Sequence, residues 1–508
     1  MKINILFLVF FLIKGFLSMA QTSSVFPKRE MRGLWITSAY NLDWPSSSSS
    51  AKKQKAEFIE ILEKHKKKHL NTIFLQIRVS ADALYNSQYE PWSKVLTGKR
   101  GKKPNYDPLQ FAIEECHKRN IELHAWFNVF RGAKSSKNIK KDKNHIVKKH
   151  PNWFLKTKAG YYFNPGKKEA TDYLKNVVID LVKKYDVDGI HFDDYFYPQE
   201  INKVKINDSK LWKKYQKSGG NLSLKDWRRE NINQFIKQVS IAIKKEKPYL
   251  KFGISPVAVW RHKDVDENGS PTQHAMSSYD DLYGDSRKWL KEEWIDYLVP
   301  QLYQSTEYPH AGFKTMIEWW DSQQFSRHLY IGHAIYKLNT EEKGWINNPL
   351  EIENQLLFSR KHEHIKGNAF FRASNFNRKT KEFEKILETE LYPYIALVPR
   401  MPWLDNIPPN SPKNLYIKRT EKGIFLTWSP PTKAADNQTA HSFLIYRVEL
   451  NLTLDFEHPK FIIAQQKETS FLDMSADPNI NYLYFITALD RLGNESDYIG
   501  ASVGKLNK

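Results

Sequence analysis

The sequence is poor in cysteine and in long apolar runs. It has 508 residues and a single cysteine, Cys116, which excludes an internal disulfide, so stability must come from a large hydrophobic core. Beyond the first twenty residues no stretch is apolar enough to span a bilayer, so we expect no stable membrane insertion. A glycine-rich G-x-G-x-x-G turn is missing after the first expected strand, which removes the usual signature of a nucleotide site.

The first twenty residues, MKINILFLVFFLIKGFLSMA, have the features of a secretory signal peptide. An early lysine precedes an apolar run, and small residues follow it at the cleavage position. Lys14 interrupts that run short of the roughly 20 residues that a membrane span needs. We therefore expect residues 1–20 to be removed and the protein to be exported, to the periplasm or to the extracellular cell envelope.

The chain is strongly basic, with 78 Lys and Arg against 57 Asp and Glu and a formal net charge of +21. In an intracellular protein this charge would suggest nucleic acid, but an exported protein more readily meets anionic wall polysaccharides or lipid head groups. We expect no nucleic-acid partner and an association with the cell envelope. The densest charge lies in residues 133–150, which we expect to be a solvated loop.

Short apolar segments alternate with amphipathic helical patterns across residues 30–375, which favours a (β/α)₈ TIM barrel over a doubly wound open sheet. We assign the barrel to residues 28–398. Helices are expected at 53–69, 107–120 and 174–185, among others. The expected strands are 32–37, 72–78, 121–130, 189–195, 251–256, 295–303, 328–336 and 367–374.

The composition and hydrophobic pattern of the sequence change near residue 399. Residues 399–411 are proline-rich and are predicted to form a linker. Residues 412–504 contain short alternating strands separated by turn residues, the pattern of a small all-β, immunoglobulin-like sandwich. Trp428, the segment NYLYFITALD and the LGNES turn resemble a fibronectin type III domain, to which we assign no chemistry.

The segment GIHFDDYFYP, residues 189–198, places two adjacent aspartates among apolar and aromatic residues. Burying unpaired carboxylates is costly, so the pair needs a reason to be there. Because side chains alternate along a strand, His191 and Asp193 are predicted to face the barrel interior, with Asp194 pointing away. Asp193 would then lie at the carboxyl end of its strand, where barrel enzymes place their chemistry.

Polar residues share one face on three other expected strands. Four such faces in one parallel barrel indicate an active or binding site more than a satisfied polar core. These residues are Gln76 and Arg78, then His124, Trp126 and Asn128, then Gln301 and Tyr303.

A second acid is needed if Asp193 acts as nucleophile or stabilising carboxylate, because adjacent strand aspartates do not readily oppose one another. Glu307, after the sixth strand, is the favoured acid/base residue, since it has no evident capping role. Asp43 and Asp82 also follow strands, but a turn-forming or capping role fits them equally well. Trp260 belongs to a group of aromatic residues near the carboxyl-end loops that would suit sugar rings.

Seven ordered motifs over about residues 28–390 resemble the glycosyl-hydrolase-like ten family of exported bacterial barrels. They are EMRGLWITSAYNLDWP, FLQIRVSADALYNSQYEPWSKVLTG, NIELHAWFNVFRG, NPGKKEATDYL, DGIHFDDYFYP, FGISPVAVWRH and DYLVPQLYQS. The resemblance implies a glycoside hydrolase with its site around Asp193 and Asp194. It also implies a peptidoglycan glycan substrate, because a relative cleaves strands that lack stem peptides. Several relatives are lipoproteins, but this chain has no cysteine for such an anchor.

The sequence thus predicts an exported glycoside hydrolase with a polysaccharide substrate, no cofactor and no metal. Retaining and inverting enzymes require two carboxyl groups about 5–5.5 Å or roughly 6.5–9.5 Å apart, although a substrate N-acetyl group can itself serve as the nucleophile. One alternative is a non-catalytic carbohydrate-binding barrel, and another is a structural wall-anchoring protein. A metal-dependent deacetylase would need His191 and Asp193, with His124 or His333, as ligands.

Overall fold

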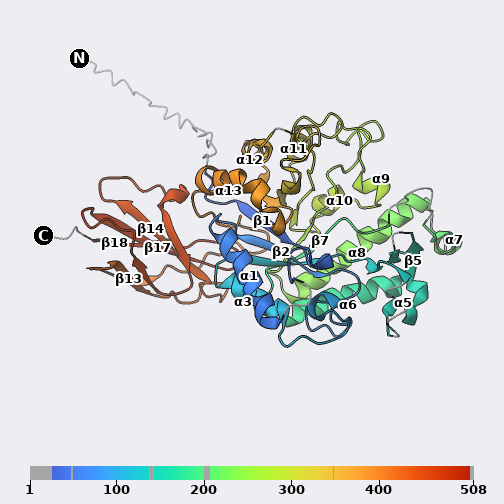
Figure 1. The fold of residues 1–508 in the computed structure, drawn as a ribbon, viewed down its shortest axis with the longest axis horizontal. Coiled ribbons are helices and arrows are strands. Elements are labelled where there is room, and N and C mark those ends of the chain that lie inside the picture. Colours follow the sequence, from blue (N-terminus) through green and yellow to red (C-terminus); the bar gives the residue numbers. More distant parts are fainter. Residues whose placement is uncertain are drawn as a thin grey trace, which may run out of the picture.

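The computed structural model describes residues 26–503, except 47–49, 137–138, 140–141, 143, 159, 199–205 and 347. The expected signal peptide, residues 1–20, lies outside the described residues. Eight parallel strands close into a barrel in chain order, which confirms the predicted TIM barrel (Figure 1). These strands are β1 (Met31–Ile36), β2 (Thr72–Arg78), β3 (Glu122–Phe127), β7 (Gly189–Phe192), β8 (Lys251–Ile254), β9 (Tyr297–Leu298), β10 (His328–His333) and β11 (Ile365–Phe370).

Helices connect the strands and cover the outside of the barrel (Figure 1). Helix α1 begins where Ser50 accepts a hydrogen bond from the backbone N–H of Lys53, and it buries Phe58 and Leu62 against the sheet. The helices are α1 (Ala51–Lys66), α2 (Lys94–Thr97), α3 (Pro108–His117), α5 (Ile146–Lys149), α6 (Lys168–Lys184), α7 (Ser209–Lys217), α8 (Leu224–Glu246), α9 (Ser278–Asp281), α10 (Ser286–Lys291), α11 (Phe313–Ser322), α12 (Glu351–Ser359) and α13 (Lys381–Ile386).

Most of the expected strands from the third onward are shorter in the structure, and two show it most clearly. The third ends at Phe127 rather than residue 130, and the sixth is reduced to β9. Gln301 nevertheless continues the sixth strand's direction, because it forms isolated bridges with Val257 and Gly332. The expected order of polar residues around the barrel mouth therefore survives these shorter strands.

Large aromatic side chains fill the barrel interior. Trp35, Phe74 and Tyr297 belong to this inner cluster. Glycine makes the space for them: a Cβ at Gly253 would lie 2.1 Å from the Tyr297 ring, and one at Gly189 would lie 2.5 Å from the His124 ring. These close fits show that side chains pack the middle of the barrel.

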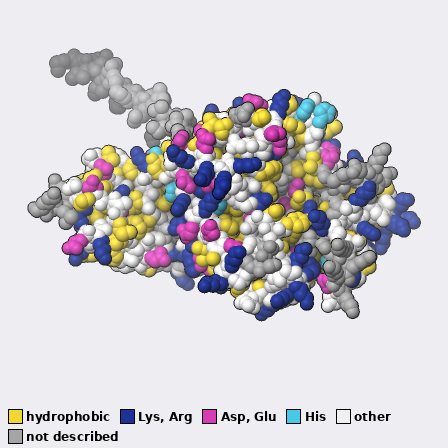
Figure 2. Space-filling view, in the orientation of Figure 1, with side chains coloured by type: hydrophobic (Ala, Val, Ile, Leu, Met, Phe, Trp, Pro, Cys, Tyr) yellow, Lys and Arg dark blue, Asp and Glu magenta, His cyan; other side chains and the backbone are white. Residues whose placement is uncertain are grey.

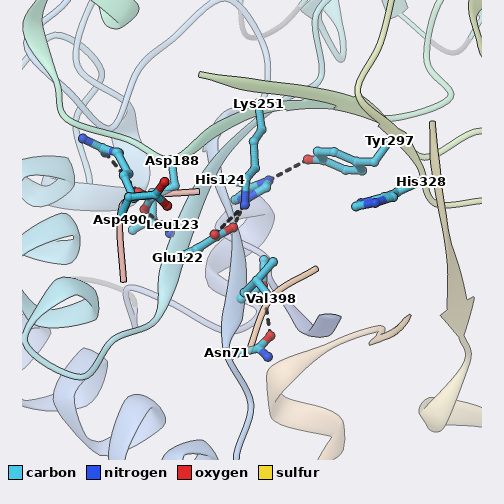
Figure 3. A network of polar contacts seen from close by, with 12 residues as sticks. Asn71, Glu122, Leu123, His124, Asp188, Lys251, Tyr297, His328, Val398 and Asp490 are labelled. Atoms are coloured by element: carbon cyan, nitrogen blue, oxygen red, sulfur yellow. Dashed lines mark hydrogen bonds and ion pairs between the residues drawn. The ribbon is translucent and has the colours of Figure 1, made fainter. Parts of the chain in front are cut away.

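A buried polar network lies at the amino end of the barrel (Figure 3). The Lys251 ammonium contacts Glu122 at 2.5 Å, and the other Glu122 oxygen contacts His124 Nε2 at 3.1 Å. His124 Nδ1 lies 2.7 Å from the Tyr297 hydroxyl. Because Glu122 accepts from Nε2–H, the Nδ1 atom of His124 accepts from the tyrosine, so the network carries its own charge balance.

An extra antiparallel sheet follows β3, formed by β4 (Arg131–Ala133), β6 (Gly160–Phe163) and β5 (Phe154–Thr157) in that order. The sequence predicted only a solvated loop over residues 133–150. In the structure Ile139 and Val147 from that segment are buried against Ala133. This lysine-rich segment therefore contains a small buried apolar cluster, which its overall charge did not indicate.

Two further antiparallel sheets complete the chain, as the predicted all-β sandwich requires. The three-stranded sheet has the order β12 (Lys413–Thr420), β13 (Gly423–Ser429), β16 (Ser470–Asp473). The four-stranded sheet has the order β15 (Ile462–Gln466), β14 (Ser442–Glu449), β17 (Tyr482–Leu489), β18 (Ile499–Val503). One cluster, which includes Trp428, Phe443 and Tyr484, is buried between them.

The all-β unit docks on the amino end of the barrel. Arg491 pairs with Asp186 and Asp188, immediately before β7, at 2.5 Å and 3.0 Å. The segment expected to be a linker is packed there too: Met401 is buried in the inner cluster, and Trp403 donates to Asp296 at 2.9 Å. The opposite end of the barrel remains open.

Candidate active site

A cavity of about 290 Å³ opens at the carboxyl ends of the barrel strands. Seven of the residues predicted from the sequence line it together. They are Gln76, Trp126, Asn128, Asp193, Asp194, Gln301 and Tyr303.

Asp193 is held at the floor of this cavity, directly after β7 ends at Phe192. Its side chain is buried, and Trp126 Nε1 donates to its Oδ2 atom at 3.0 Å. Asn128 Nδ2 donates to the same oxygen, and the backbone N–H of Tyr195 reaches the Oδ1 atom at 3.3 Å. These donors fix the orientation of the carboxyl group and favour its ionised form.

A relay of amide groups fixes Asn128 in turn. The backbone N–H groups of Ser38 and Ala39 donate to Gln76 Oε1 at 3.0 Å and 2.9 Å. Gln76 Nε2 is thereby directed at Asn128 Oδ1, 2.5 Å away, which leaves Asn128 Nδ2 to donate to Asp193. Residues from the first three strands therefore position a carboxyl group that follows the fourth.

The prediction that Asp194 points away from the cavity was wrong, because Asp194 lines the same cavity as Asp193. The strand alternation stops at Phe192, and the chain turns before Asp194. Gln301 bonds to Asp194, and its Nε2 also donates to the carbonyl of Ser255 at 3.0 Å. Both members of the aspartate pair, Asp193 and Asp194, thus face the cavity, with Asp194 the more exposed of the two.

The aspartate pair holds protons unusually tightly. Burial raises the pKa of Asp193 to about 8, with the Asp194 charge adding to the rise. Burial raises the pKa of Asp194 to about 6. Arg131, on the cavity wall, acts against both rises. Because adjacent carboxyl groups titrate together, the pair keeps one proton between about pH 6 and about pH 8.

His191 lies beneath the aspartate pair and contacts the cavity only through its neighbours. Its Nδ1 atom is 3.2 Å from the Tyr297 hydroxyl, and its Nε2 atom is 3.2 Å from Ser255 Oγ and 3.4 Å from Trp35 Nε1. Desolvation holds the pKa of His191 well below its usual value, so the ring is neutral. Its role is to support Ser255 and Trp35, both of which line the cavity.

The remaining predicted residues hold the loops around the cavity. Arg78 is buried in a two-point ion pair with Glu90, both contacts at 2.7 Å. Asp43 pairs with Arg372 at 2.7 Å and accepts from the backbone of Thr37.

Asp82, His124 and Trp260 are likewise engaged away from the cavity. Asp82 accepts from the backbone N–H of Ser80 and lies 3.6 Å from Arg100. His124 belongs to the buried network at the amino end, and Trp260 donates to Asp285 at 2.9 Å. None of these three residues lines the cavity.

Glu307, the predicted acid/base residue, is exposed and borders a different hollow, beside Lys314 and Lys343. The structure does not bring it to the aspartate pair. The strand alternation that suggested it ends with β9 at Leu298, and Glu307 lies in a turn nine residues later.

Sequence reasoning missed Trp35, Ser255 and Arg131 as cavity residues. Trp35 and Ser255 stand in or directly after expected strands, so the alternation rule could have found them. Arg131 had no such signal, because the small sheet that carries it was not predicted.

The described part of the chain contains no group of three or more His, Cys, Asp or Glu arranged to hold a metal ion. Among the described residues, no helix combines the length and apolar character needed to cross a membrane. Of the histidines of the deacetylase alternative, His333 bonds to Gln355 and Asn368, whereas His124 and His191 both contact the Tyr297 hydroxyl.

Comparison with known proteins adds a family. Residues 30–347 match the family described as Glycosyl hydrolase-like 10. The chain is 41% identical over 477 residues to the Glycosyl hydrolase YngK of Bacillus subtilis (strain 168), and the alignment covers 92% of each protein. It is 35% identical over 372 residues to the Glycosyl hydrolase DigH of Escherichia coli (strain K12), covering 68% of this chain and 84% of that protein. The solved glycoside hydrolase domain of PgaB (BpsB) from Bordetella bronchiseptica aligns with 71% of this chain and 99% of its own, at 10% identity and a TM-score of 0.49.

Proposed function

We propose, from the premise that this chain belongs to the Glycosyl hydrolase-like 10 family, that it is an exported glycoside hydrolase acting on the glycan strands of peptidoglycan. The observation that carries the proposal is the aspartate pair, which shares one proton at the floor of an open cavity at the carboxyl end of the barrel. Both relatives named above are called glycosyl hydrolases. Export is supported by the features of the first twenty residues.

The position of the aspartate pair favours a mechanism in which the substrate supplies the nucleophile. Two carboxyl groups on consecutive residues lie on one side of a bound sugar, whereas the usual two-carboxylate mechanisms place them on both sides of the glycosidic bond. Peptidoglycan sugars carry a 2-acetamido group, whose carbonyl oxygen can attack the anomeric carbon. Asp193, fixed by three donors, then accepts the acetamido N–H, and the more exposed Asp194 serves as acid and base.

In the free protein the shared proton is held mainly by Asp193, whose pKa is the higher of the two. When Asp193 accepts the acetamido N–H, its ionised form is favoured and the shared proton passes to Asp194. Asp194 then donates this proton to the glycosidic oxygen as the bond from that oxygen to the anomeric carbon breaks. The acetamido oxygen forms a bond to the same carbon, giving a cyclic oxazolinium, and the leaving sugar departs as an alcohol. Asp194 then takes a proton from water, and the resulting hydroxide bonds to the anomeric carbon as the ring opens. The acetamido group is regenerated and the configuration is retained.

Aromatic walls suit a sugar ring in this cavity. Trp35, Trp126 and Tyr303 line it, and their rings offer apolar faces to the C–H groups of a saccharide. Gln76 and Gln301 add amide groups beside the aspartate pair. The C-terminal sheets, which we propose form a fibronectin type III unit, dock at the other end of the barrel and contribute nothing to this cavity.

The proposal is tested by the release of reducing ends from peptidoglycan glycans, with and without stem peptides. Wild type should cleave, and Asp193→Asn and Asp194→Asn should each lose about a hundredfold or more in rate. Glu307→Gln makes the same chemical change on an exposed residue and should leave the rate unchanged. Retention of all variants on the polymer without cleavage by any of them would make the barrel a carbohydrate-binding protein instead.

A second substrate separates the two roles. An aryl 2-acetamido glycoside with a nitrophenol leaving group needs no proton from the enzyme when its bond breaks. Asp194→Asn should therefore recover most of its first-step rate on this substrate, whereas Asp193→Asn should not. The reverse pattern would exchange the roles of the two aspartates.

A further inference from the structure

Arg131 stands on the cavity wall, where Asp193 and Asp194 attract its charge without forming an ion pair with it. Its guanidinium lies over the Tyr195 ring, 3.8 Å from the centroid, and 5.9 Å from that of Tyr162. Its Nε atom is buried and has no hydrogen-bond partner in the described part of the chain. No carboxylate of the described residues lies within ion-pair distance of it.

A second cation lies on the same cavity. Lys134 is exposed, and its ammonium is 4.4 Å from the centroid of the ring of Tyr40, a cavity-lining residue that is 63% exposed. Lys134, too, makes no ion pair with a described residue. Two cations, each resting on a tyrosine, therefore border the cavity that contains the aspartate pair.

Two other stacked arginines of this protein differ in this respect. Arg228 lies 5.0 Å from the centroid of Tyr283 and is also ion-paired with Asp208 at 2.7 Å. Arg447 lies over Tyr482 and is ion-paired with Asp473, also at 2.7 Å. In both cases the ring holds the guanidinium plane and a carboxylate fills its N–H edge, whereas at Arg131 that edge is left for a ligand.

A guanidinium held flat against an aromatic ring is prepared for a planar anion. Its fork of N–H donors matches a carboxylate, and the stacking restricts the side chain before the ligand arrives. Asp193 and Asp194 attract the guanidinium but do not bond to it, so a ligand carboxylate would add an ion pair at the open N–H edge. A neutral glycan cannot form this ion pair with the guanidinium.

We propose that Arg131, assisted by Lys134, selects a glycan whose sugar in the cavity carries a free carboxylate; this rests on the glycoside hydrolase function proposed above. In peptidoglycan the lactyl group of each muramoyl residue supplies such a carboxylate only where no peptide is attached, because the peptide converts it to a neutral amide. The two cations would thus distinguish peptide-free from peptide-bearing sugars by charge. Arg131 acts by direct contact, and Lys134, which is more exposed, by longer-range attraction.

The test compares one glycan in two forms: peptide-free strands with free carboxylates, and the same strands with the carboxyls reduced to alcohols. The measured quantity is the ratio of kcat/KM for the carboxylate form to that for the alcohol form. For wild type this ratio should be about 10 to 100, the range for one charge-assisted contact. Arg131→Gln should bring it close to unity, Arg131→Lys should restore part of it, and Lys134→Gln should lower it a few-fold.

Lys156→Gln is the matched control. Lys156 is exposed on β5 of the same small sheet, does not line the cavity, and loses the same charge in this variant. Its ratio should equal that of wild type. The ratio also cancels any effect that Arg131 has through the pKa of the aspartate pair, since that effect is common to both substrates.

Equal losses of Arg131→Gln on the two substrates would overturn the inference and make Arg131 a positioning residue for the aspartate pair. If wild type cleaves neither form, the proposed function fails, and binding still decides the inference. Calorimetric titration of both glycans into Asp193→Asn and into the Asp193→Asn/Arg131→Gln double variant gives the same ratio as affinities. Identical affinities for the carboxylate and alcohol forms in Asp193→Asn would refute the selection.

Discussion

The buried carboxyl of Asp193 should make the active site a source of instability that grows with pH. Its pKa is raised to about 8 in the folded state, against about 3.9 in an unfolded chain. Between these values the folded state binds a proton that the unfolded state has lost, so stability falls as pH rises and stops falling near pH 8. The loss relative to a neutral side chain is about 1–2 kcal/mol at pH 5 and about 5 kcal/mol above pH 8.

Asp193→Asn removes this titration while keeping the main contacts. The amide oxygen still accepts from Trp126 and Asn128, and only the 3.3 Å contact with the Tyr195 backbone is lost. The variant should therefore be inactive but more stable than wild type. The difference should grow by about 4 kcal/mol from pH 5 to pH 8, or roughly 4–8 °C in Tm for a domain of this size.

Thermal unfolding followed by circular dichroism at several pH values between about 5 and about 9 measures this difference. Glu307→Gln, on an exposed side chain, is the control and should follow wild type at every pH. A difference between Asp193→Asn and wild type that stays constant with pH would refute the reasoning. So would a variant less stable than wild type at pH 8, because the carboxylate would then be well accommodated.

Three further outcomes follow from the same structure. The rate of glycan hydrolysis should follow a bell-shaped pH profile that falls off below about pH 6 and above about pH 8. Below this range both aspartates are protonated and the pair has no base, and above it both are ionised and the pair has no acid. A profile that falls off at ordinary carboxyl pKa values would contradict the assignment. Gly253→Ala should lower the free energy of unfolding by about 1–3 kcal/mol in denaturant titration, because its Cβ would lie 2.1 Å from the Tyr297 ring, and an unchanged midpoint would mean that the ring moves freely. Arg491→Ala should speed proteolytic release of the C-terminal unit while leaving the aspartate pair's hydrolysis rate unchanged, because the ion pairs with Asp186 and Asp188 lie at the far end of the barrel; an equal loss of activity would reveal coupling between the two ends.

The barrel could be predicted because its elements are local. Each strand is a short apolar run bounded by polar residues, and the helices between them repeat an apolar stripe. The cavity residues Gln76, Asn128 and Gln301 were also within reach, since strand alternation puts them on the inner face and parallel strands bring their carboxyl ends together. Strand alternation failed at Asp194 and Glu307 because the chain no longer follows the strand direction there: Asp194 lies in a bend after β7, and Glu307 lies in a turn well after β9.

The sequence by itself determined the barrel, the all-β unit after it, and the collection of polar side chains around Asp193, because periodicity and chain order are enough for these. Only the tertiary structure decided that Asp194 shares the cavity, that Glu307 does not, and that Arg131 lines it. Each of those depends on where the chain goes after a strand ends, and loop paths are set by contacts between residues far apart in sequence. The proton affinity of the aspartate pair belongs to the same class, because burial and neighbouring charge exist only in the folded chain.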